Sequence, residues 1–182
     1  MKGICFTEEM FNAVIDGRKC QTRRIMKPQP QTFYNNIPFY STGRTFEEGT
    51  IIAEIKPRYK VGEKDYLKEP YFIDDDRVIY RFDNYKDDHL ICKWENKLFM
   101  PEKHARYFIE ITEVRCERLQ DISDEDCLKE GIKTDGWCFW YEEGNTFSYA
   151  KHAYEAIIEK INGRGTWGSN PYVWRYSFKL VK

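Results

Sequence analysis

The most regular alternation of side chains in the sequence is Tyr172-Val173-Trp174-Arg175-Tyr176-Ser177-Phe178-Lys179-Leu180. Large apolar side chains stand at every even-numbered position, and Arg175, Ser177 and Lys179 stand between them. A period of two is typical of a β-strand that buries one face, and aromatic residues favour strands. We therefore expect this segment to pair in the centre of a sheet and to bury its aromatic face.

A second long segment with alternating side chains, residues 106–119, predicts another strand. Its apolar side chains change parity between Ile111 and Val114, so a residue near Thr112 breaks the alternation. Such a break indicates a β-bulge or a bend, which small barrels need in order to close. Shorter strands are expected over residues 2–6, 51–55 and 65–69.

Three segments carry the signals of helices. Thr7 is an N-cap residue followed by two acids, and Gly17 ends the helix expected over residues 8–16. Further helices are expected over residues 123–130 and 148–161. Together with the strands, they predict an α+β fold: a small, mostly antiparallel, partly closed β-barrel with about three helices packed at its ends.

Length and composition limit the classes of protein to consider. The 182 residues fit a single domain covering residues 1–182. The 29 basic and 30 acidic side chains leave a formal net charge of -1, so any nucleic-acid binding must rest on local charge. No stretch approaches the roughly 18 apolar residues of a membrane helix, and we expect a cytoplasmic protein with no membrane partner. The six cysteines and three histidines lack metal-site spacing, so we expect neither a metal nor a cofactor.

Residues 27–50 interrupt every periodic pattern in the sequence. They contain Pro28, Pro30 and Pro38 together with several glycines and asparagines. We expect an inserted irregular segment here, which either covers a cleft as a lid or lies against the surface.

A run of basic residues occupies the ten positions Arg18-Lys19-Cys20-Gln21-Thr22-Arg23-Arg24-Ile25-Met26-Lys27, which hold five positive charges and no negative one. Because Gly17 ends the preceding helix, we expect Lys19, Thr22 and Arg24 to lie on a loop. The lack of an acid favours contact with phosphate. The alternative is a solvated loop that binds nothing.

Glu69 is expected to point into the protein at the end of a strand. Alternation along residues 65–69 places it on the same face as Leu67, which is expected in the core. A buried carboxylate is costly unless it is paired, so Glu69 should have a cationic partner.

The order and spacing of these motifs resemble the ASCH domain, a branch of the PUA-like superfamily of small β-barrels. The resemblance rests on Gly17-x-Lys19-x-x-Thr22-x-Arg24, on residues 61–69 and 110–132, and on the ending at residues 170–174. It covers most of the chain outside residues 27–50 and 133–147, and it points to the longer ASCH proteins that bacteriophages and prophages often carry.

The resemblance implies a fold, a ligand class and a possible reaction. ASCH proteins are proposed to bind RNA or nucleotide-like ligands in a cleft beside the first helix, and a small bacterial branch hydrolyses the amide of N4-acetylcytidine. Lys19, Thr22 and Glu69 match the three residues that this branch uses. In that scheme Thr22 is the nucleophile, Lys19 its base and Glu69 the proton relay, and Arg24 contacts the oxyanion or the ligand. Arg23 stands where the family has an apolar residue.

The protonation state of Lys19 decides whether it can act as a base, because only a neutral lysine accepts a proton. Burial and the nearby Arg18, Arg23 and Arg24 would lower the pKa of Lys19, whereas an adjacent Glu69 would raise it. The sequence leaves the balance open.

Three functions are compatible with these observations. The first is binding of RNA or a modified nucleoside, with Arg18, Arg23, Arg24 and Tyr71 as further ligand contacts. Tyr71 would stack on a base, as would Trp94 or Trp167, although packing in the core is an alternative role for each. The second function is deacylation of N4-acetylcytidine-like nucleosides, and the third is that of a non-catalytic, phage-encoded protein-interaction factor.

A structural role for the same residues is a further alternative. Lys19 and Glu69 would then form an ion pair that ties the loop to the barrel, and Thr22 would cap a turn.

Overall fold

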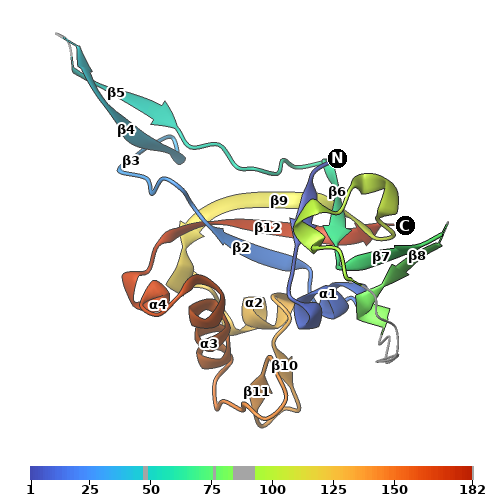
Figure 1. The fold of residues 1–182 in the computed structure, drawn as a ribbon. Coiled ribbons are helices and arrows are strands. Elements are labelled where there is room, and N and C mark those ends of the chain that lie inside the picture. The colour runs from blue at the N-terminus through green and yellow to red at the C-terminus, as the bar shows by residue number, and fades with distance from the viewer. Residues whose placement is uncertain (47–48, 76, 84–92, 182) are drawn as a thin grey trace.

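The computed structural model describes residues 1–46, 49–75, 77–83 and 93–181 (Figure 1). Its centre is a five-stranded sheet with the order β1-β6-β9-β12-β2. The strands are β1 (Gly3–Cys5), β6 (Lys64–Lys68), β9 (Phe108–Arg118), β12 (Tyr172–Val181) and β2 (Gln21–Ile25). β1 pairs parallel with β6, and the other three pairings are antiparallel.

The expected central strand is confirmed as β12, which pairs with β9 on one side and β2 on the other. The expected burial of its aromatic face is confirmed only in part: Tyr176 and Phe178 are buried, whereas Leu180 is exposed and Val173, of the other parity, is buried. In the pairing with β9, Ser177 faces Glu113 and Phe178 faces Ile111, so Thr112 is the extra residue of a bulge. The break in alternation near Thr112 therefore marks the bulge as expected.

The α+β class and the mainly antiparallel pairing are confirmed, but the described residues do not form a closed barrel. β1 and β2 are the edges of the sheet, and within the described ranges no backbone pairing joins them. β1 has only three residues, and the chain turns into the first helix soon after, so β1 offers little length for pairing. A side chain links the two edges instead, because Nη2 of Arg24 donates to the main-chain O of Cys5 (2.8 Å).

In the described part of the chain, four α-helices lie on one side of the sheet (Figure 1). They are α1 (Glu8–Ile15), α2 (Asp124–Lys129), α3 (Ala150–Asn162) and α4 (Thr166–Ser169). The first three confirm the predicted helices, and Thr7 caps α1 by accepting a hydrogen bond from the main-chain N of Met10. The short α4 was not expected. Among the described helices, none combines the length and the apolar character needed to cross a bilayer.

The main hydrophobic core lies between the sheet and these helices. α1 contributes Met10, Phe11 and Val14, and β9 contributes Ile109 and Ile111, all at most 5% exposed. Short 3-10 helices join the larger elements within the described ranges: η1 (Arg81–Asp83), η2 (Lys97–Phe99), η3 (Glu102–His104) and η4 (Leu119–Asp121).

Two hairpins extend from this body. β7 (Tyr71–Asp74) pairs with β8 (Arg77–Tyr80), and β10 (Lys133–Thr134) pairs with β11 (Phe139–Trp140).

The segment expected to be irregular, residues 27–50, instead contributes most of a three-stranded antiparallel sheet. Its strands are β3 (Thr32–Tyr34), β4 (Ile37–Phe46) and β5 (Gly49–Glu54). Asn35 and Asn36 both have positive φ, 48° and 65°, which suits a two-residue hairpin turn. The prediction of an irregular segment was wrong, because Asn35 and Asn36 form the turn between the paired strands β3 and β4.

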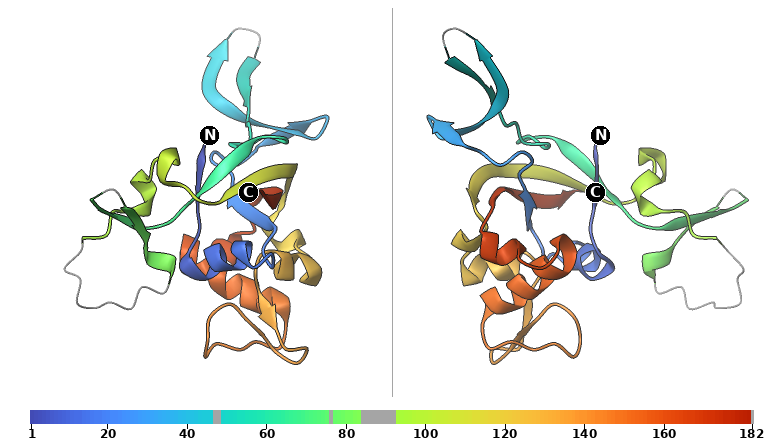
Figure 2. Two further views of the ribbon diagram at one scale, coloured as in Figure 1. Left: turned by 90° about the vertical axis from the view of Figure 1, so that its right-hand side faces the viewer. Right: turned by 60° about the vertical axis from the view of Figure 1, so that its left-hand side comes forward.

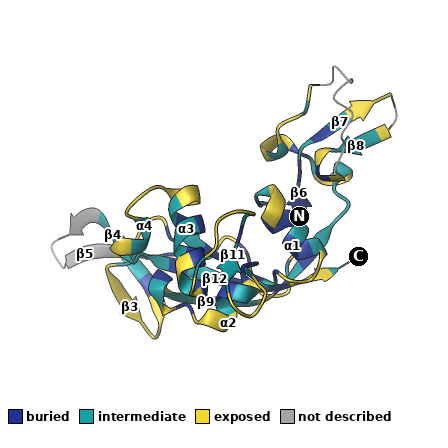
Figure 3. Ribbon diagram, turned by 90° about the horizontal axis from the view of Figure 1, so that it is seen from below, coloured by how far each residue is buried: buried dark blue, intermediate teal, exposed yellow. Residues whose placement is uncertain are grey.

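This sheet, which we call the arm, projects from the side of the body opposite the helices (Figures 1 and 2). β3 is exposed along its length (Figure 3). One contact with the body is made by the rings of Phe33 and Tyr172, whose centroids lie 5.0 Å apart.

Candidate functional site

A cavity of about 260 Å³ lies beside the two edges of the main sheet. We call it the first cavity. Its polar lining comes mainly from the segment before β2, from β2 itself, from the C-cap of α2 and from α3, whereas its apolar lining comes mainly from the start of α1 and from α3. The polar side chains are Thr7, Lys19, Thr22, Arg23, Arg24, Lys97, Glu130, Tyr154 and Asn162, and the apolar ones include Phe6, Met10 and Ile157.

Lys19 is held at this cavity by both its backbone and its side chain. Its main-chain N donates to the O of Ala13 in α1 (2.8 Å). Its Nζ donates to the main-chain O of Glu130 (2.7 Å) and to Oε2 of the same residue (2.7 Å). Only 3% of the Lys19 side chain is exposed. The ion pair that the structural alternative placed between Lys19 and Glu69 is thus made with Glu130 instead.

The surroundings of Lys19 act on its protonation in opposite directions. Burial is the largest influence and lowers the pKa of Lys19, Glu130 raises it, and Arg24 and Arg23 lower it further. The net direction is downward. Burial therefore favours the neutral amine more than the carboxylate of Glu130 favours the ammonium.

Glu130 is the site residue that reasoning from the sequence missed. It is the C-cap of α2, and its Oε1 also accepts from Nη1 of Arg23 (3.1 Å). The next residue, Gly131, has φ +103°, and a Cβ there would lie 3.1 Å from Sδ of Met10. This close approach of the end of α2 to α1 brings the Glu130 carboxylate to Lys19. A Glu before a helix-ending Gly is too common a pattern to reveal such a role.

Thr22 and Arg24 lie on β2, so the prediction that they lie on a loop was wrong. Thr22 is buried and stands opposite Tyr176 of β12. The open edge of β12 offers backbone partners along its length, and this pairing outweighs the polar character of the segment. Both side chains line the first cavity, as Lys19 does.

Arg24 spans the gap between the sheet edges. Besides its hydrogen bond to Cys5, its guanidinium lies 5.3 Å from the ring centroid of Phe6. Nζ of Lys19 lies 5.4 Å from the same centroid. Two cations therefore meet one aromatic ring in the cavity wall.

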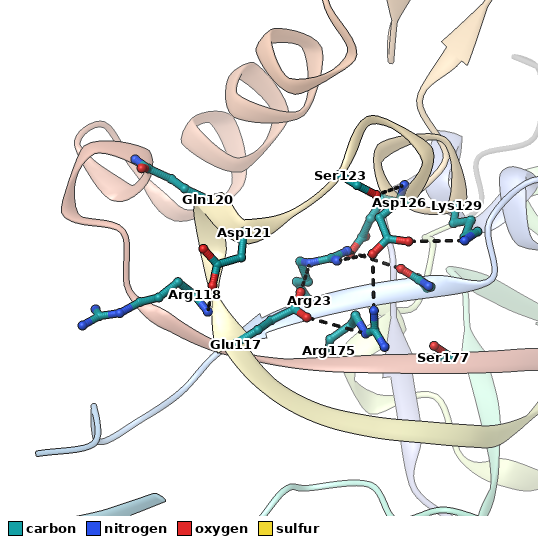
Figure 4. A network of polar contacts seen from close by, with 12 residues as sticks. Arg23, Glu117, Arg118, Gln120, Asp121, Ser123, Asp126, Lys129, Arg175 and Ser177 are labelled. Atoms are coloured by element: carbon teal, nitrogen blue, oxygen red, sulfur yellow. Dashed lines mark hydrogen bonds and ion pairs between the residues drawn. The ribbon is translucent and has the colours of Figure 1, made fainter. Parts of the chain in front are cut away.

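Arg23 was expected to contact a ligand, but its donors are taken by carboxylates (Figure 4). Nε donates to Glu117 (2.7 Å), Nη2 to Asp126 (2.8 Å) and Nη1 to Glu130 (3.1 Å). Burial lowers the pKa of Arg23, but these acids outweigh it, and the net direction is upward. Arg23 is therefore buried without leaving an unpaired charge.

The same network binds α2 to the sheet. Nη1 of Arg175 on β12 lies 3.4 Å from Oδ2 of Asp126, which also accepts from Arg23 (Figure 4). Burial raises the pKa of Asp126, but the hydrogen bond from Arg23 and the positive charge of Arg23 lower it, and the net direction is downward. The carboxylate therefore stays ionised.

Glu69 has the cationic partner that its burial demands, and this expectation is confirmed. Only 1% of its side chain is exposed, and Arg106 binds it with two hydrogen bonds, Nε to Oε1 (2.7 Å) and Nη2 to Oε2 (2.8 Å). Arg106 also pairs with Asp83. Burial raises the pKa of Glu69, and Arg106 opposes this rise. Glu69 is not one of the described residues that line the first cavity.

Two other expected ligand contacts also lie away from this cavity. Arg18 is paired on the surface with Asp16 (2.9 Å). Tyr71 is buried, and its ring centroid lies 5.2 Å from that of His104. The structure thus brings Lys19, Thr22, Arg23 and Arg24 together and leaves the other expected residues elsewhere.

Tyr154 is a second residue that the sequence analysis did not single out. It lies on α3, is 2% exposed and lines the first cavity. Its hydroxyl is buried without a hydrogen-bond partner among the described residues. Burial raises the pKa of Tyr154 well above its ordinary value, and the charge of Glu130 adds to the rise. The signal in the sequence that could have identified Tyr154 is its position among the apolar residues of an expected helix.

Within the described ranges, no group of three or more His, Cys, Asp and Glu side chains is placed to hold a metal ion.

Comparisons of the chain with protein-family models, with curated proteins and with solved structures gave no match. The ASCH resemblance stays a prediction based on the order of the motifs.

Proposed function

We propose that the chain is an ASCH-type, PUA-like domain whose first cavity binds a nucleobase or nucleoside, free or as part of RNA. One observation carries this proposal. The cavity combines apolar walls with a buried Lys19–Glu130 pair and with the Tyr154 hydroxyl, which has no hydrogen-bond partner among the described residues.

The chemistry of a nucleobase suits these surroundings. A base has apolar faces and an edge of hydrogen-bond donors and acceptors. Phe6, Met10 and Ile157 provide apolar surface for the faces. Lys19 can donate, and the hydroxyl of Tyr154 can donate and accept. The volume of about 260 Å³ lies just below the range typical of drug-sized ligands, as expected for a single nucleoside or less.

A thermal-shift screen against modified and unmodified nucleosides tests the proposal, because a ligand that binds only the folded state raises the melting temperature. Tyr154→Phe should reduce the shift, since it removes a hydroxyl from the cavity. Tyr149→Phe is the matched control, because Tyr149 is 62% exposed and lies outside the cavity. Equal shifts for both variants, or no shift with any nucleoside, would contradict the proposal.

Amide hydrolysis is a second candidate, favoured by the lowered pKa of Lys19 beside Thr22 in one cavity. In this scheme the neutral Nζ of Lys19 takes the hydroxyl proton as Oγ1 of Thr22 attacks the acyl carbon of N4-acetylcytidine. Arg24 stabilises the oxyanion. The C–N bond breaks, the proton passes to N4 of cytidine, and water then hydrolyses the Thr22 ester to acetate. The carboxylate next to Lys19 in this scheme is that of Glu130.

Chromatography of cytidine released from N4-acetylcytidine tests this candidate. Thr22→Ser keeps a hydroxyl and should keep turnover, whereas Thr22→Val keeps the shape and should abolish it. Nucleoside binding by Thr22→Val, measured by thermal shift, controls for folding. Turnover by Thr22→Val would exclude Thr22 as the nucleophile.

A further inference from the structure

A second cavity, of about 600 Å³, adjoins the first. Its lining comes from β1, from β2 and the residues after it, from the chain that follows β5, and from β12, with Lys68 of β6 and Leu98 of η2. Cys5, Arg24 and Ile25 line both cavities. A molecule held in the first cavity therefore has the second cavity next to it, with Arg24 between them.

The lining of the second cavity is strongly basic. It includes five cationic side chains, those of Arg24, Lys27, Lys56, Arg58 and Lys68. Among the described residues that line it there is no Asp or Glu. The whole chain has a net charge of -1, so this positive charge is concentrated at one place.

Most of this charge has no carboxylate partner in the described part of the chain. Lys56 is 3.8 Å from Glu54, whereas Arg24 and Lys68 donate to the main-chain carbonyls of Cys5 (2.8 Å) and Leu98 (2.7 Å). A carbonyl positions a cation without neutralising it. Arg23, one residue from Arg24, shows the contrast, because three carboxylates surround it.

Aromatic side chains stand among these cations. Tyr59, Trp174 and Tyr176 line the second cavity, and the guanidinium of Arg58 lies 5.5 Å from the ring centroid of Tyr59. Trp174 is half-buried. Tyr59 and Tyr176 are buried, so Trp174 is the ring that can stack on a base. Cations beside an accessible aromatic ring are typical of surfaces that follow a single-stranded nucleic acid.

We propose that the second cavity binds the phosphates of a single-stranded nucleic acid, one base of which enters the first cavity. This inference rests on the proposed function of the first cavity and names its substrate class as a polynucleotide. A base can enter a cavity lined by Phe6 and Tyr154 only after leaving its stack, so the ligand must be single-stranded there. Arg24 then contacts the phosphate attached to the inserted nucleoside.

Fluorescence anisotropy with a labelled, unstructured RNA of about eight nucleotides tests the inference, since sites of roughly 4–16 nucleotides are typical. The variant is Lys56→Gln/Arg58→Gln, which removes two exposed cations of the second cavity and none of the first. The matched control is Lys60→Gln/Lys103→Gln. Both of its lysines are exposed and outside the two cavities, and the net charge changes equally.

The inference predicts that the Lys56/Arg58 variant loses roughly tenfold in RNA affinity at low salt, as two exposed charge contacts warrant. The slope of log K against log salt should fall by about 1.4, because each phosphate contact of a single strand contributes about 0.7. The Lys60/Lys103 control should keep the wild-type slope. Both variants should keep the wild-type thermal shift with nucleosides.

The inference is overturned if wild-type protein does not bind the RNA, or if the Lys56/Arg58 variant behaves like its control. It is also overturned if poly-glutamate displaces the RNA as well as unlabelled RNA does, because any polyanion would then suffice. These failures leave the proposed nucleoside site standing. If the RNA responds to Lys56 and Arg58 while no nucleoside raises the melting temperature, the phosphate site stands and the proposed role of the first cavity fails.

Discussion

Lys19 and Glu130 form a buried ion pair in which Nζ lies 2.7 Å from Oε2, although 111 positions separate them in the chain. The pair ties the segment before β2 to the end of α2. Lys19, on which the proposed chemistry depends, therefore also holds two elements of the fold together. A Lys19 variant that loses function must have its free energy of unfolding measured too, because a loss of folding would have the same effect.

Glu130→Gln should destabilise the fold more than Lys19→Met. Without the Glu130 charge, both Lys19 and Arg23 lose a carboxylate in a buried place. Breaking such a pair costs about 3–5 kcal/mol. Without the Lys19 charge, Glu130 still has Arg23 at 3.1 Å, so we expect a cost of about half as much. Urea unfolding at neutral pH measures both free energies, and the reverse order would contradict the prediction.

The contribution of Lys19 to the free energy of unfolding should vary with pH in the alkaline range. Burial lowers the pKa of Lys19 in the folded state below its ordinary value of 10.5. Between these two values the unfolded chain binds more protons than the folded chain, so the free energy of unfolding rises with pH in this window. Lys19→Met lacks this titration. The wild type should therefore gain stability relative to Lys19→Met as pH rises toward 10.5, and a constant difference between their urea midpoints would count against it.

Tyr154→Phe should leave the free energy of unfolding unchanged or raise it by up to about 1 kcal/mol, because it removes a buried hydroxyl that lacks a partner among the described residues. Tyr176→Phe is the matched control, since Tyr176 is equally buried and its hydroxyl accepts from the main-chain N of Arg58 (3.1 Å). The control should cost about 1 kcal/mol. Chemical denaturation compares the two, and an equal cost would indicate that the Tyr154 hydroxyl is hydrogen-bonded in solution.

Arg106→Met should destabilise the protein by about 3 kcal/mol at neutral pH, because it leaves the carboxylate of Glu69 buried without its partner. Burial already raises the pKa of Glu69 above 4.5, and loss of Arg106 should raise it further. The folded variant then binds a proton more tightly than its unfolded chain, so stability is lost as pH rises through the folded-state pKa. Thermal melting across this range should show the penalty shrinking toward pH 4.5. A penalty independent of pH would refute this account.

Glu69→Gln should leave nucleoside binding and any turnover unchanged, because Glu69 is bound to Arg106 and is not among the described residues that line the first cavity. Glu130→Gln should impair both. Titration calorimetry with the best nucleoside from the thermal screen compares the two variants under conditions where both are folded. A loss of binding or turnover in Glu69→Gln would restore it to the role that the ASCH resemblance implies.

Local patterns predicted the main helices and the two longest central strands of this fold, and some of its burial. The alternation along residues 172–180 predicted the central strand, and the parity change near Thr112 predicted its bulge with β9. Alternation also placed Glu69 inside, where a cation had to meet it. These results follow from the backbone period of two, which is a property of neighbouring residues.

Strand β2 shows where local patterns fail. Its sequence, Gln21–Ile25, is polar and follows a helix stop, so a loop was the natural prediction. This segment is a strand because its backbone pairs with the edge of β12. Glu117 of β9 and Asp126 of α2 pair with Arg23, which allows this arginine to be buried there. Such compensation depends on segments that are distant in the sequence.

Residue types and their spacing therefore determined the three longest helices and the long strands β9 and β12, but not β2, β3, β4 or α4. Only the tertiary structure decided which acid each cation meets: Glu130 for Lys19 and Glu69 for Arg106. The physical reason is that periodicity fixes the direction of a side chain relative to its own element. Its partner depends on how distant elements pack, and several acids satisfy the same demand for a charge.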